Sequence, residues 1–419
     1  TLNGVTNRYD GHGHVISDDL VLDKTTYLRL KGGTKEVYDK LSFGPVDESA
    51  VNQHPTVTIK NGSGFYCTYR DCGGKPDPDT TGSSVRSYLD TYIGEHGGSG
   101  MFIVQTKGNF GSNISERGLW LEDVFVSANA TSDGKYIDIL RIDSSGVADI
   151  DILVNNNSKP ARILFNGGTF YDNYNQHNDG KGPFQPAKDT AIILEGENKQ
   201  NIIFKKAYCS HSLNAGAGTL RFQGDCGVEI QDGGSKLPGL SGANRLALTI
   251  PGNGPIEWRQ TGPLTIKSNG FVLTASTNAL PYRADEPIVF LDGNGILDLD
   301  GKAVNVRTLI GTANAMVTNV SHSTYTSSKL VFGTEDTDGV FSAKTYYGVS
   351  AEKVGTGTLV VSNATMDVHN TGKGLFTVKA GTVILVGTNK IGDTDMFESD
   401  RFIVENGATV IREVVVDVA

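Results

Sequence analysis

The sequence predicts an all-β solenoid, in which the chain coils into stacked rungs of short strands. Three observations lead to this prediction. Glycine supplies 52 of the 419 residues and proline 13, so tight turns are frequent without the composition of a disordered chain. A G-x-G motif followed by alternating apolar residues recurs four times, and a second motif, two strand-like runs that meet at a glycine, recurs three times. Many short strands joined by many turns are typical of a repetitive β architecture.

The two motifs fill much of the second half of the chain. The first stands at GAGTLRF (216–222), GNGPIEW (252–258), GNGILDL (293–299) and GTGTLVV (355–361). The second stands at LTIKSNGFVL (264–273), FTVKAGTVIL (376–385) and FIVENGATVI (402–411). The residues that follow each G-x-G alternate with period two and are rich in Val, Leu, Ile, Thr and Phe, which predicts strands.

The motif glycines are expected to turn corners. A phosphate-binding loop needs a helix directly after its glycines, and the strand-like runs here argue against one. Glycine adopts positive φ without a Cβ clash, as a tight corner requires. The expected turn glycines are Gly216, Gly218, Gly252, Gly254, Gly293, Gly295, Gly355, Gly357, Gly381 and Gly407. Without a Walker loop or Rossmann fingerprint, no cofactor is expected.

The solenoid is expected over residues 101–419, with the regular repeats at about 215–412. Stacking the rungs at the inter-strand spacing of about 4.8 Å builds one core from side chains that no rung buries alone. Residues 1–100 are less regular and are expected to cap one end, because an uncapped rung exposes strand edges. Within them SVRSYLDTYIGEHG (84–97) is expected to form a short helix.

The C-terminal part resembles a known repeat. The run AEKVGTGTLVVSNATM…GLFTVKAGTVILVG (351–387) is similar to the autotransporter-associated β-strand repeat of secreted bacterial passenger domains, which reads L-x-K-x-G-x-G-T-L-x-L-x-G…T-x-V-x-x-G-T-L. The matching positions are Lys353, Gly355, Gly357, Thr358, Leu359, Val361, Val378, Gly381, Thr382 and Ile384. The resemblance covers residues 285–412 closely and 215–280 loosely. It departs where ATMDVHNTGKG (364–374) replaces the family's N-T-Y-x-G insertion.

This resemblance implies a right-handed β-helix that is secreted or displayed on a bacterial cell surface. A structural or adhesive role, with glycans or a host surface as partners, follows as the expected function. The net charge of −10 argues against nucleic acid and anionic membranes as partners, and no apolar run is long enough to span a bilayer. A polysaccharide-active enzyme, either a lyase or a glycoside hydrolase, is the first alternative. A subunit of an extracellular filament, self-associating through REVVVDVA (412–419), is the second.

The four cysteines form two local pairs, Cys67 with Cys72 and Cys209 with Cys226. Neither pair has the C-x-x-C spacing of a zinc site, and no metal site is expected. In an oxidising compartment each pair is expected to form a disulfide, with free buried thiols as the alternative.

The stretch FNGGTFYDNYNQHNDGKGPFQPAKD (165–189) interrupts the strand rhythm with polar and aromatic residues. Long loops that leave a rigid scaffold often carry function, and tyrosines stack on sugar rings while acids bind their hydroxyls. The candidate ligand-binding residues are Tyr171, Asp172, Tyr174, His177 and Asp179. Asp172 and Asp179 are considered as an acid/base pair, a plain insertion is the other interpretation, and no residue is assigned a catalytic role.

Two further segments carry clustered acids, GTEDTDGVF (333–341) and KIGDTDMFESD (390–400). Calcium ligation is one interpretation, but neither segment matches an EF-hand loop or a calcium β-roll repeat. Acidic turns of an acidic protein are the simpler expectation.

Overall fold

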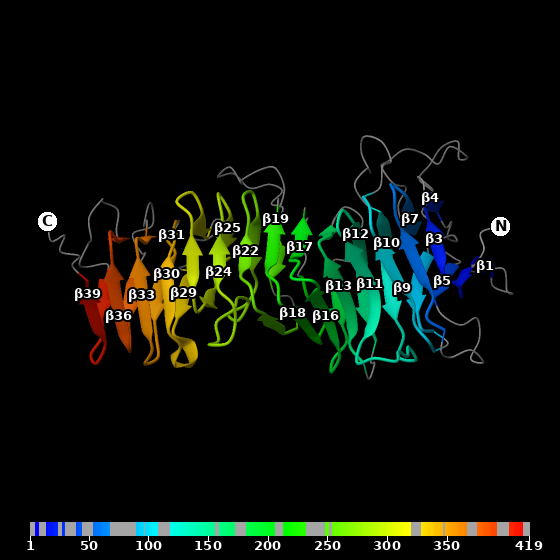
Figure 1. Ribbon diagram of the computed structural model, residues 1–419. Coiled ribbons are helices and arrows are strands. Elements are labelled where there is room, and N and C mark those ends of the chain that lie inside the picture. The colour runs from blue at the N-terminus through cyan, green and yellow to red at the C-terminus, as the bar shows by residue number, and fades with distance from the viewer. Residues whose placement is uncertain are drawn as a thin grey trace, which may run out of the picture. The chain divides into compact units, whose positions relative to one another are not determined.

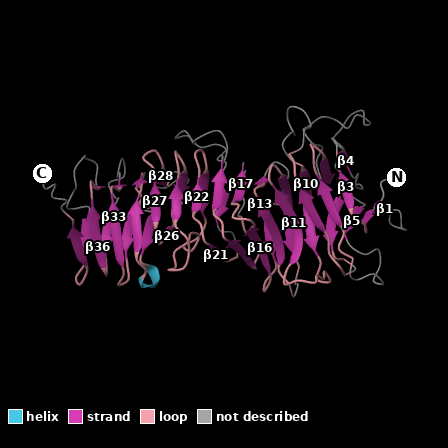
Figure 2. Ribbon diagram, viewed as in Figure 1, coloured by secondary structure: helices cyan, strands magenta, loops and turns pink. Residues whose placement is uncertain are grey.

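The computed structural model shows an all-β chain in which nearly every strand pairs in parallel. It describes residues 5–7, 14–23, 27–29, 39–43, 53–67, 89–95, 97–107, 118–155, 159–171, 182–205, 213–231, 248–250, 254–319, 328–346, 348–366, 375–391 and 402–413. Figure 2 shows strands throughout these residues, and the helical content among them is one 3₁₀ turn, η3 (Thr334–Asp336). The β-solenoid that the sequence predicts is confirmed.

The chain divides into two compact units. Unit 1 contains residues 1–205, 213–226 and 253–257, and unit 2 contains residues 206–212, 227–252 and 258–419. β21 (Ile256–Gln260) has residues in both.

Unit 1 contains two parallel ladders of strands (Figure 1). The first, the long sheet, contains β2 (His14–Ile16), β4 (Tyr27–Arg29), β5 (Asp39–Phe43), β7 (Gly64–Cys67), β8 (Leu89–Ile93), β10 (Leu119–Val126), β12 (Val147–Val154), β14 (Thr169–Tyr171), β15 (Phe184–Pro186) and β17 (Ile202–Lys205). The second contains β3 (Leu20–Leu22), β6 (Thr56–Ile59), β9 (Met101–Val104), β11 (Ile137–Asp143), β13 (Ala161–Asn166), β16 (Ala191–Gly196) and β18 (Thr219–Gly224). β1 (Val5–Asn7) pairs antiparallel with β2.

Unit 2 contains three parallel ladders. The first runs through β19 (Val228–Gln231), β22 (Leu264–Ile266), β24 (Val289–Leu291), β27 (Leu309–Gly311), β30 (Gly339–Ser342), β33 (Thr358–Ser362), β36 (Thr382–Val386) and β39 (Thr409–Arg412). The second runs through β20 (Leu248–Ile250), β23 (Phe271–Thr274), β25 (Ile296–Asp298), β28 (Met316–Thr318), β31 (Lys344–Thr345), β34 (Thr365–Met366) and β37 (Lys390–Ile391). The third runs through β26 (Ala303–Asn305), β29 (Lys329–Phe332), β32 (Ser350–Lys353), β35 (Phe376–Val378) and β38 (Phe402–Val404).

The order of strands along the chain shows the rungs of unit 2. β24, β25 and β26 form one rung, and β27, β28 and β29 pair with them in the same order. Val289 lies 20 residues before its partner Leu309, and Leu309 lies 32 residues before its partner Phe341. The rungs therefore stack in register although the loops between their strands differ in length.

Buried side chains from successive rungs form the core. In unit 1 Phe204 contacts Phe170 at 5.8 Å, Phe222 at 6.2 Å, and Phe165 and Phe184 at 6.3 Å between ring centroids. All five rings are 2% exposed or less, so each removes most of its apolar surface from water, worth about 1.5–3 kcal/mol. The strand alternation brings these rings to one side of each sheet.

The repeat corner at Gly355 and Gly357 shows why the motif contains glycines. Gly355 has φ of 66°, in the left-handed region. Gly357 does not have a positive φ, but a Cβ atom there would lie 2.5 Å from the carbonyl oxygen of Thr337 in the preceding rung. One glycine therefore satisfies the backbone conformation and the other allows the rungs to approach closely.

Lys353 of the same repeat is fully buried. Its Nζ donates hydrogen bonds to the carbonyl oxygens of Val354 at 2.6 Å, Gly355 at 2.9 Å and Ala380 at 3.4 Å. Burial lowers the pKa of this amine, and the Asp336 and Asp338 carboxylates oppose that shift. The lysine of the repeat thus satisfies backbone carbonyl groups of two successive rungs.

One secondary-structure prediction is wrong. The segment 84–97 was expected to contain a helix, but its described part contains the strand β8, which pairs in parallel with β5 and β10. Buried Thr91 and Ile93 alternate with half-buried Asp90 and Tyr92, the pattern of a strand with one face inward. Pairing with two neighbouring strands overrides the weak local helix preference.

The second ladder of unit 1 also contains strands on both sides of residue 100. β6 pairs with β9 over Thr56↔Met101 to Ile59↔Val104, so strands before this boundary extend the second ladder of unit 1. Much of residues 1–100 lies outside the described residues, and the cap expected there stays a prediction.

Candidate functional site

The outer face of the long sheet in unit 1 carries a group of acidic and aromatic residues. Strands β8, β10 and β12 are neighbours, with Tyr92 paired to Phe125 and Phe125 paired to Leu153. Side chains alternate along each strand, and the intervening residues Thr91, Val124 and Ile152 are buried in the core. The outward positions are Asp90 and Tyr92 on β8, Trp120, Asp123 and Phe125 on β10, and Asp149, Asp151 and Leu153 on β12. We call these eight residues the acidic–aromatic face.

Tyr92 and Phe125 form its centre. Their ring centroids lie 5.0 Å apart at an interplanar angle of 16°, and both side chains are half-buried. Such offset stacking is a favoured arrangement of aromatic rings and turns one face of each ring toward the other. Burial, followed by the carboxylates of Asp90, Glu95 and Asp123, raises the pKa of Tyr92 to about 12. The tyrosine therefore stays neutral at neutral pH.

The carboxyl groups lie in register across the strands. Asp123 is the direct partner of Asp151, and Trp120 is the partner of Asp149. Asp149 is 1% exposed and Asp151 2% exposed, so these two acids lie beneath other parts of the protein rather than in open solvent. Like charges at opposing positions of neighbouring strands repel, and burying carboxylates adds a desolvation cost. Register thus brings several acids and two aromatic rings together on three neighbouring strands, which makes the face a candidate site.

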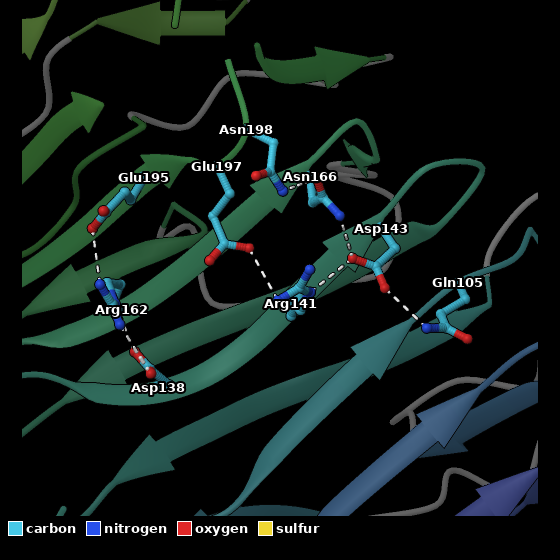
Figure 3. A network of polar contacts seen from close by, with 9 residues as sticks. All are labelled: Gln105, Asp138, Arg141, Asp143, Arg162, Asn166, Glu195, Glu197 and Asn198. Atoms are coloured by element: carbon cyan, nitrogen blue, oxygen red, sulfur yellow. Dashed lines mark hydrogen bonds and ion pairs between the residues drawn. The ribbon is translucent and has the colours of Figure 1, made fainter. Parts of the chain in front are cut away.

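A second polar cluster covers the outer face of the second ladder of unit 1 (Figure 3). Arg162 on β13 lies between two acids, as Figure 3 shows: its Nε and Nη2 donate to Asp138 at 2.6 and 3.0 Å, and its Nη1 to Glu195 at 3.1 Å. The hydrogen bond to Asp138 is the largest single influence on Arg162 and raises its pKa above the ordinary value. Gln223 donates to the same Glu195 at 2.8 Å.

Asp143 is the centre of the other half of this cluster. It accepts hydrogen bonds from Arg141 at 2.8 Å, Gln105 at 2.9 Å and Asn166 at 3.0 Å, and Arg141 also pairs with Glu197 at 3.2 Å (Figure 3). Burial acts to raise the pKa of Asp143, but its three hydrogen-bond donors together hold that pKa below the usual range. Asp138, Arg162 and Glu195 alternate in charge over β11, β13 and β16, so this cluster joins successive rungs.

A cavity of about 310 Å³ lies beside Arg162, lined in part by His54, Ser99 and Tyr136. His54 Nδ1 and Ser99 Oγ are hydrogen-bonded at 2.8 Å, and the Arg162 guanidinium lies 4.7 Å from the centre of the Tyr136 ring. Because Arg162 already binds two acids and a ring, little of its charge is free for an anion. The cavity therefore ranks below the acidic–aromatic face as a site.

Among the residues predicted to bind a ligand, Tyr171 is described. It ends β14, where it is half-buried and pairs with Lys205. Its neighbour Phe170 points into the core as the partner of Ala148, so Tyr171 lies on the same side of the sheet as Asp149. Asp172, Tyr174, His177 and Asp179 lie outside the described residues.

The acids of 333–341 have structural partners. Asp336 accepts a hydrogen bond from the Thr356 amide and Asp338 one from the Thr358 amide, each at 2.6 Å. They thus join η3 and the turn after it to the next repeat corner. No group of three potential ligand residues with metal-binding geometry is found within the described ranges.

The predicted disulfide between Cys209 and Cys226 is wrong. Cys226 is a free, buried thiol, and burial raises its pKa to about 11. A Cβ atom on Gly196 would lie 2.5 Å from its Sγ, so the thiol packs as a small apolar group over the preceding rung. Cys209, Cys72 and the side chain of Cys67 lie outside the described residues, and the Cys67–Cys72 pairing stays a prediction.

The sequence contains a pattern that indicates the acidic–aromatic face, but no single motif is sufficient to predict it. D-x-Y at 90–92, D-x-F at 123–125 and D-x-D at 149–151 each place an acid two residues before another outward group. These residues can be recognised as one site only when the pairing of β8, β10 and β12 is known.

No family model, curated protein or solved structure matches the chain. In the described part of the chain, no helix has the length and apolar character needed to cross a bilayer.

Proposed function

We propose that this chain is a secreted or cell-surface β-solenoid, similar to a bacterial passenger domain, that binds carbohydrate on the acidic–aromatic face. The observation that carries the proposal is the stacked Tyr92–Phe125 pair with Asp90 and Asp123 beside it. The repeat at 351–387 supports the extracellular location, because its resemblance is to secreted proteins.

The chemistry of the face suits a sugar chain. Pyranose rings present C–H groups on their faces and hydroxyl groups at their edges, so half-buried aromatic rings contact the former while carboxylates accept hydrogen bonds from the latter. A parallel ladder repeats its outward positions at about 4.8 Å, which extends the contact surface over several strands. Tyr171 lies on the neighbouring strand β14 and supplies a further ring on the same side of the sheet.

A polysaccharide-active enzyme is the second candidate, favoured by one observation. Asp123 and Asp151 are paired residues on neighbouring strands, and Asp149 lies two positions from Asp151 on the same face. Glycoside hydrolases use two carboxyl groups about 5–10 Å apart as acid and nucleophile or base. In that case Asp123 and Asp151 are the residues to substitute first.

A glycan array combined with a reducing-end release assay on the full chain distinguishes the two. Binding without release of new reducing ends supports the binding protein, and release that is lost in Asp151→Asn supports the enzyme. Failure to bind or cleave any glycan contradicts both.

The site itself is tested with Phe125→Ala. Loss of the stacked ring is expected to weaken glycan binding about 3- to 10-fold. The matched control is Phe290→Ala, which removes a half-buried outward Phe from β24 in unit 2 and is expected to leave binding unchanged. Equal losses in both variants would show that the face is not the site.

A further inference from the structure

The cavity beside Arg162 contains a serine and a histidine in direct contact. His54 Nδ1 and Ser99 Oγ lie 2.8 Å apart, within hydrogen-bond distance. Ser99 is 6% exposed and His54 is half-buried, and both residues line the cavity of about 310 Å³. A hydroxyl group hydrogen-bonded to an imidazole at the wall of a cavity is the arrangement of a nucleophile and its general base.

Backbone hydrogen bonds hold the two residues in place. The Ser99 amide donates to the carbonyl oxygen of Gln53 at 3.1 Å. The Met101 amide donates to the carbonyl oxygen of Pro55, also at 3.1 Å, so backbone hydrogen bonds stand on both sides of the contact. β6 and β9 then continue the pairing in parallel. The serine and the histidine therefore sit on two successive rungs of a paired ladder, where their contact is preorganised.

The polar atoms of this pair are not used elsewhere. Within the described residues the Ser99 hydroxyl has the His54 ring as its one side-chain partner, and His54 Nε2 has no protein partner. For Nδ1 to accept the hydroxyl proton, the neutral ring carries its own proton on Nε2. In that tautomer the imidazole is placed to take a proton from Ser99.

Two further groups that line the cavity are suited to stabilise an oxyanion. Lys135 is exposed, and its Nζ lies 5.1 Å from the centre of the Tyr136 ring. The hydrogen bond from Gln223 is the largest influence on the pKa of Tyr136 and lowers it; burial opposes this shift, and Lys135 adds to it. A more acidic hydroxyl is a stronger hydrogen-bond donor, and an ammonium group stabilises negative charge directly.

We propose that Ser99 and His54 hydrolyse esters of short carboxylic acids in this cavity. The cavity volume lies at the lower end of the range for small-molecule sites, which favours a short acyl group. This activity goes beyond the carbohydrate binding proposed above and depends on other residues of unit 1.

The reaction consumes one ester and one water molecule. Ser99 Oγ attacks the acyl carbon, its proton passes to His54 Nδ1, and the carbonyl oxygen becomes an oxyanion. When this intermediate collapses, the bond to the alcohol oxygen breaks and the alcohol leaves with the proton from His54. Water then attacks the acyl group on Ser99, with His54 again as the base. The carboxylic acid is released and the Ser99 hydroxyl is restored.

Labelling of the full chain with a fluorophosphonate ester tests the nucleophile directly. We expect covalent modification of a single serine, which tandem mass spectrometry places at Ser99. Because this measurement uses the unaltered chain, it decides the assignment even where a variant does not fold. No label, or label spread equally over other serines, would overturn the proposal.

Hydrolysis of p-nitrophenyl acetate tests the pair. The rate is expected to fall at least about 100-fold in Ser99→Ala and in His54→Asn, whose amide forms hydrogen bonds but is not a base. Thermal melting of each variant identifies a loss of folding. The matched control Ser144→Ala removes an exposed serine of unit 1 and is expected to keep both the label and the rate.

The outcomes are independent of the glycan measurements. Equal rates in folded His54→Asn and in the unaltered chain would overturn the esterase assignment while carbohydrate binding stands. Failure to bind any glycan on the array would overturn the proposed function and leave the assignment of Ser99 and His54 unchanged.

Discussion

Gly355 and Gly357 stand two residues apart in the repeat but require glycine for different reasons. Gly355 has a left-handed backbone, whereas Gly357 lies against the Thr337 carbonyl of the preceding rung. The nearby Lys353 amine binds carbonyl oxygens of the same corner, so the motif combines a bend, a close approach and a hydrogen-bond donor. Lys353, Gly355 and Gly357 thus each have a structural role that requires no ligand.

Gly357→Ala is expected to destabilise the protein by about 1–3 kcal/mol, because the new Cβ must displace a backbone carbonyl. The loss is expected in hydrogen exchange of the neighbouring rungs first, since solenoid contacts are mainly between neighbours. The control is Gly134→Ala, where a Cβ atom would meet nothing within 4 Å. An unchanged thermal melt of Gly357→Ala would contradict this explanation of the corner.

At the scale of elements, the ladders of unit 2 are joined by charged side chains as well as by backbone. Glu352 on β32 pairs with Lys329 on β29 at 2.6 Å and with Lys379, which follows β35, at 3.0 Å. Burial acts to raise the pKa of Glu352, but the two ammonium groups together hold it below its ordinary value of 4.5. The ionised carboxylate therefore contributes stability to three successive rungs.

The lowered pKa of Glu352 determines how its contribution to the free energy of unfolding changes with pH. The contribution of Glu352 is complete above its unfolded pKa near 4.5 and is lost as the pH falls through the lower folded pKa. Glu352→Gln is expected to cost about 1 kcal/mol of unfolding free energy at neutral pH and progressively less in acid, measured by denaturant unfolding. The matched control is Glu413→Gln, at an exposed position directly after β39. A difference that persists unchanged at pH 2 would show that charge is not the cause.

The sequence was sufficient for the parallel ladders of unit 2, because glycine pairs and period-two runs mark their corners and strands directly. It was insufficient for β8, where LDTYI carries a local helix signal that pairing with β5 and β10 overrides. It was also insufficient for the candidate site, since Asp90, Asp123 and Asp149 are separated by about one rung of chain each and meet only through register. Cys226 shows the same limit, because nearness in sequence did not decide which groups its thiol contacts.

At the scale of the molecule, both units consist of stacked parallel strand ladders, and they differ in the residues that point outward. Unit 2 carries the regular repeats, whose acids and lysines bind backbone groups or one another. Unit 1 carries the acidic–aromatic face, in which Asp123 is the register partner of Asp151. We infer that the repeats of unit 2 form a rigid scaffold and that unit 1 binds the carbohydrate ligand. Self-association through residues 412–419 stays a separate prediction, since residues 414–419 lie outside the described ranges.

Hydrogen–deuterium exchange of the full chain, with and without the oligosaccharide that the array ranks first, tests the central claim most directly. We predict that added protection appears in 89–95, 119–126 and 147–154 and that the repeat corners of unit 2 around 353–358 exchange as before. Protection concentrated in unit 2, with β8, β10 and β12 unchanged, would contradict a recognition site on the acidic–aromatic face.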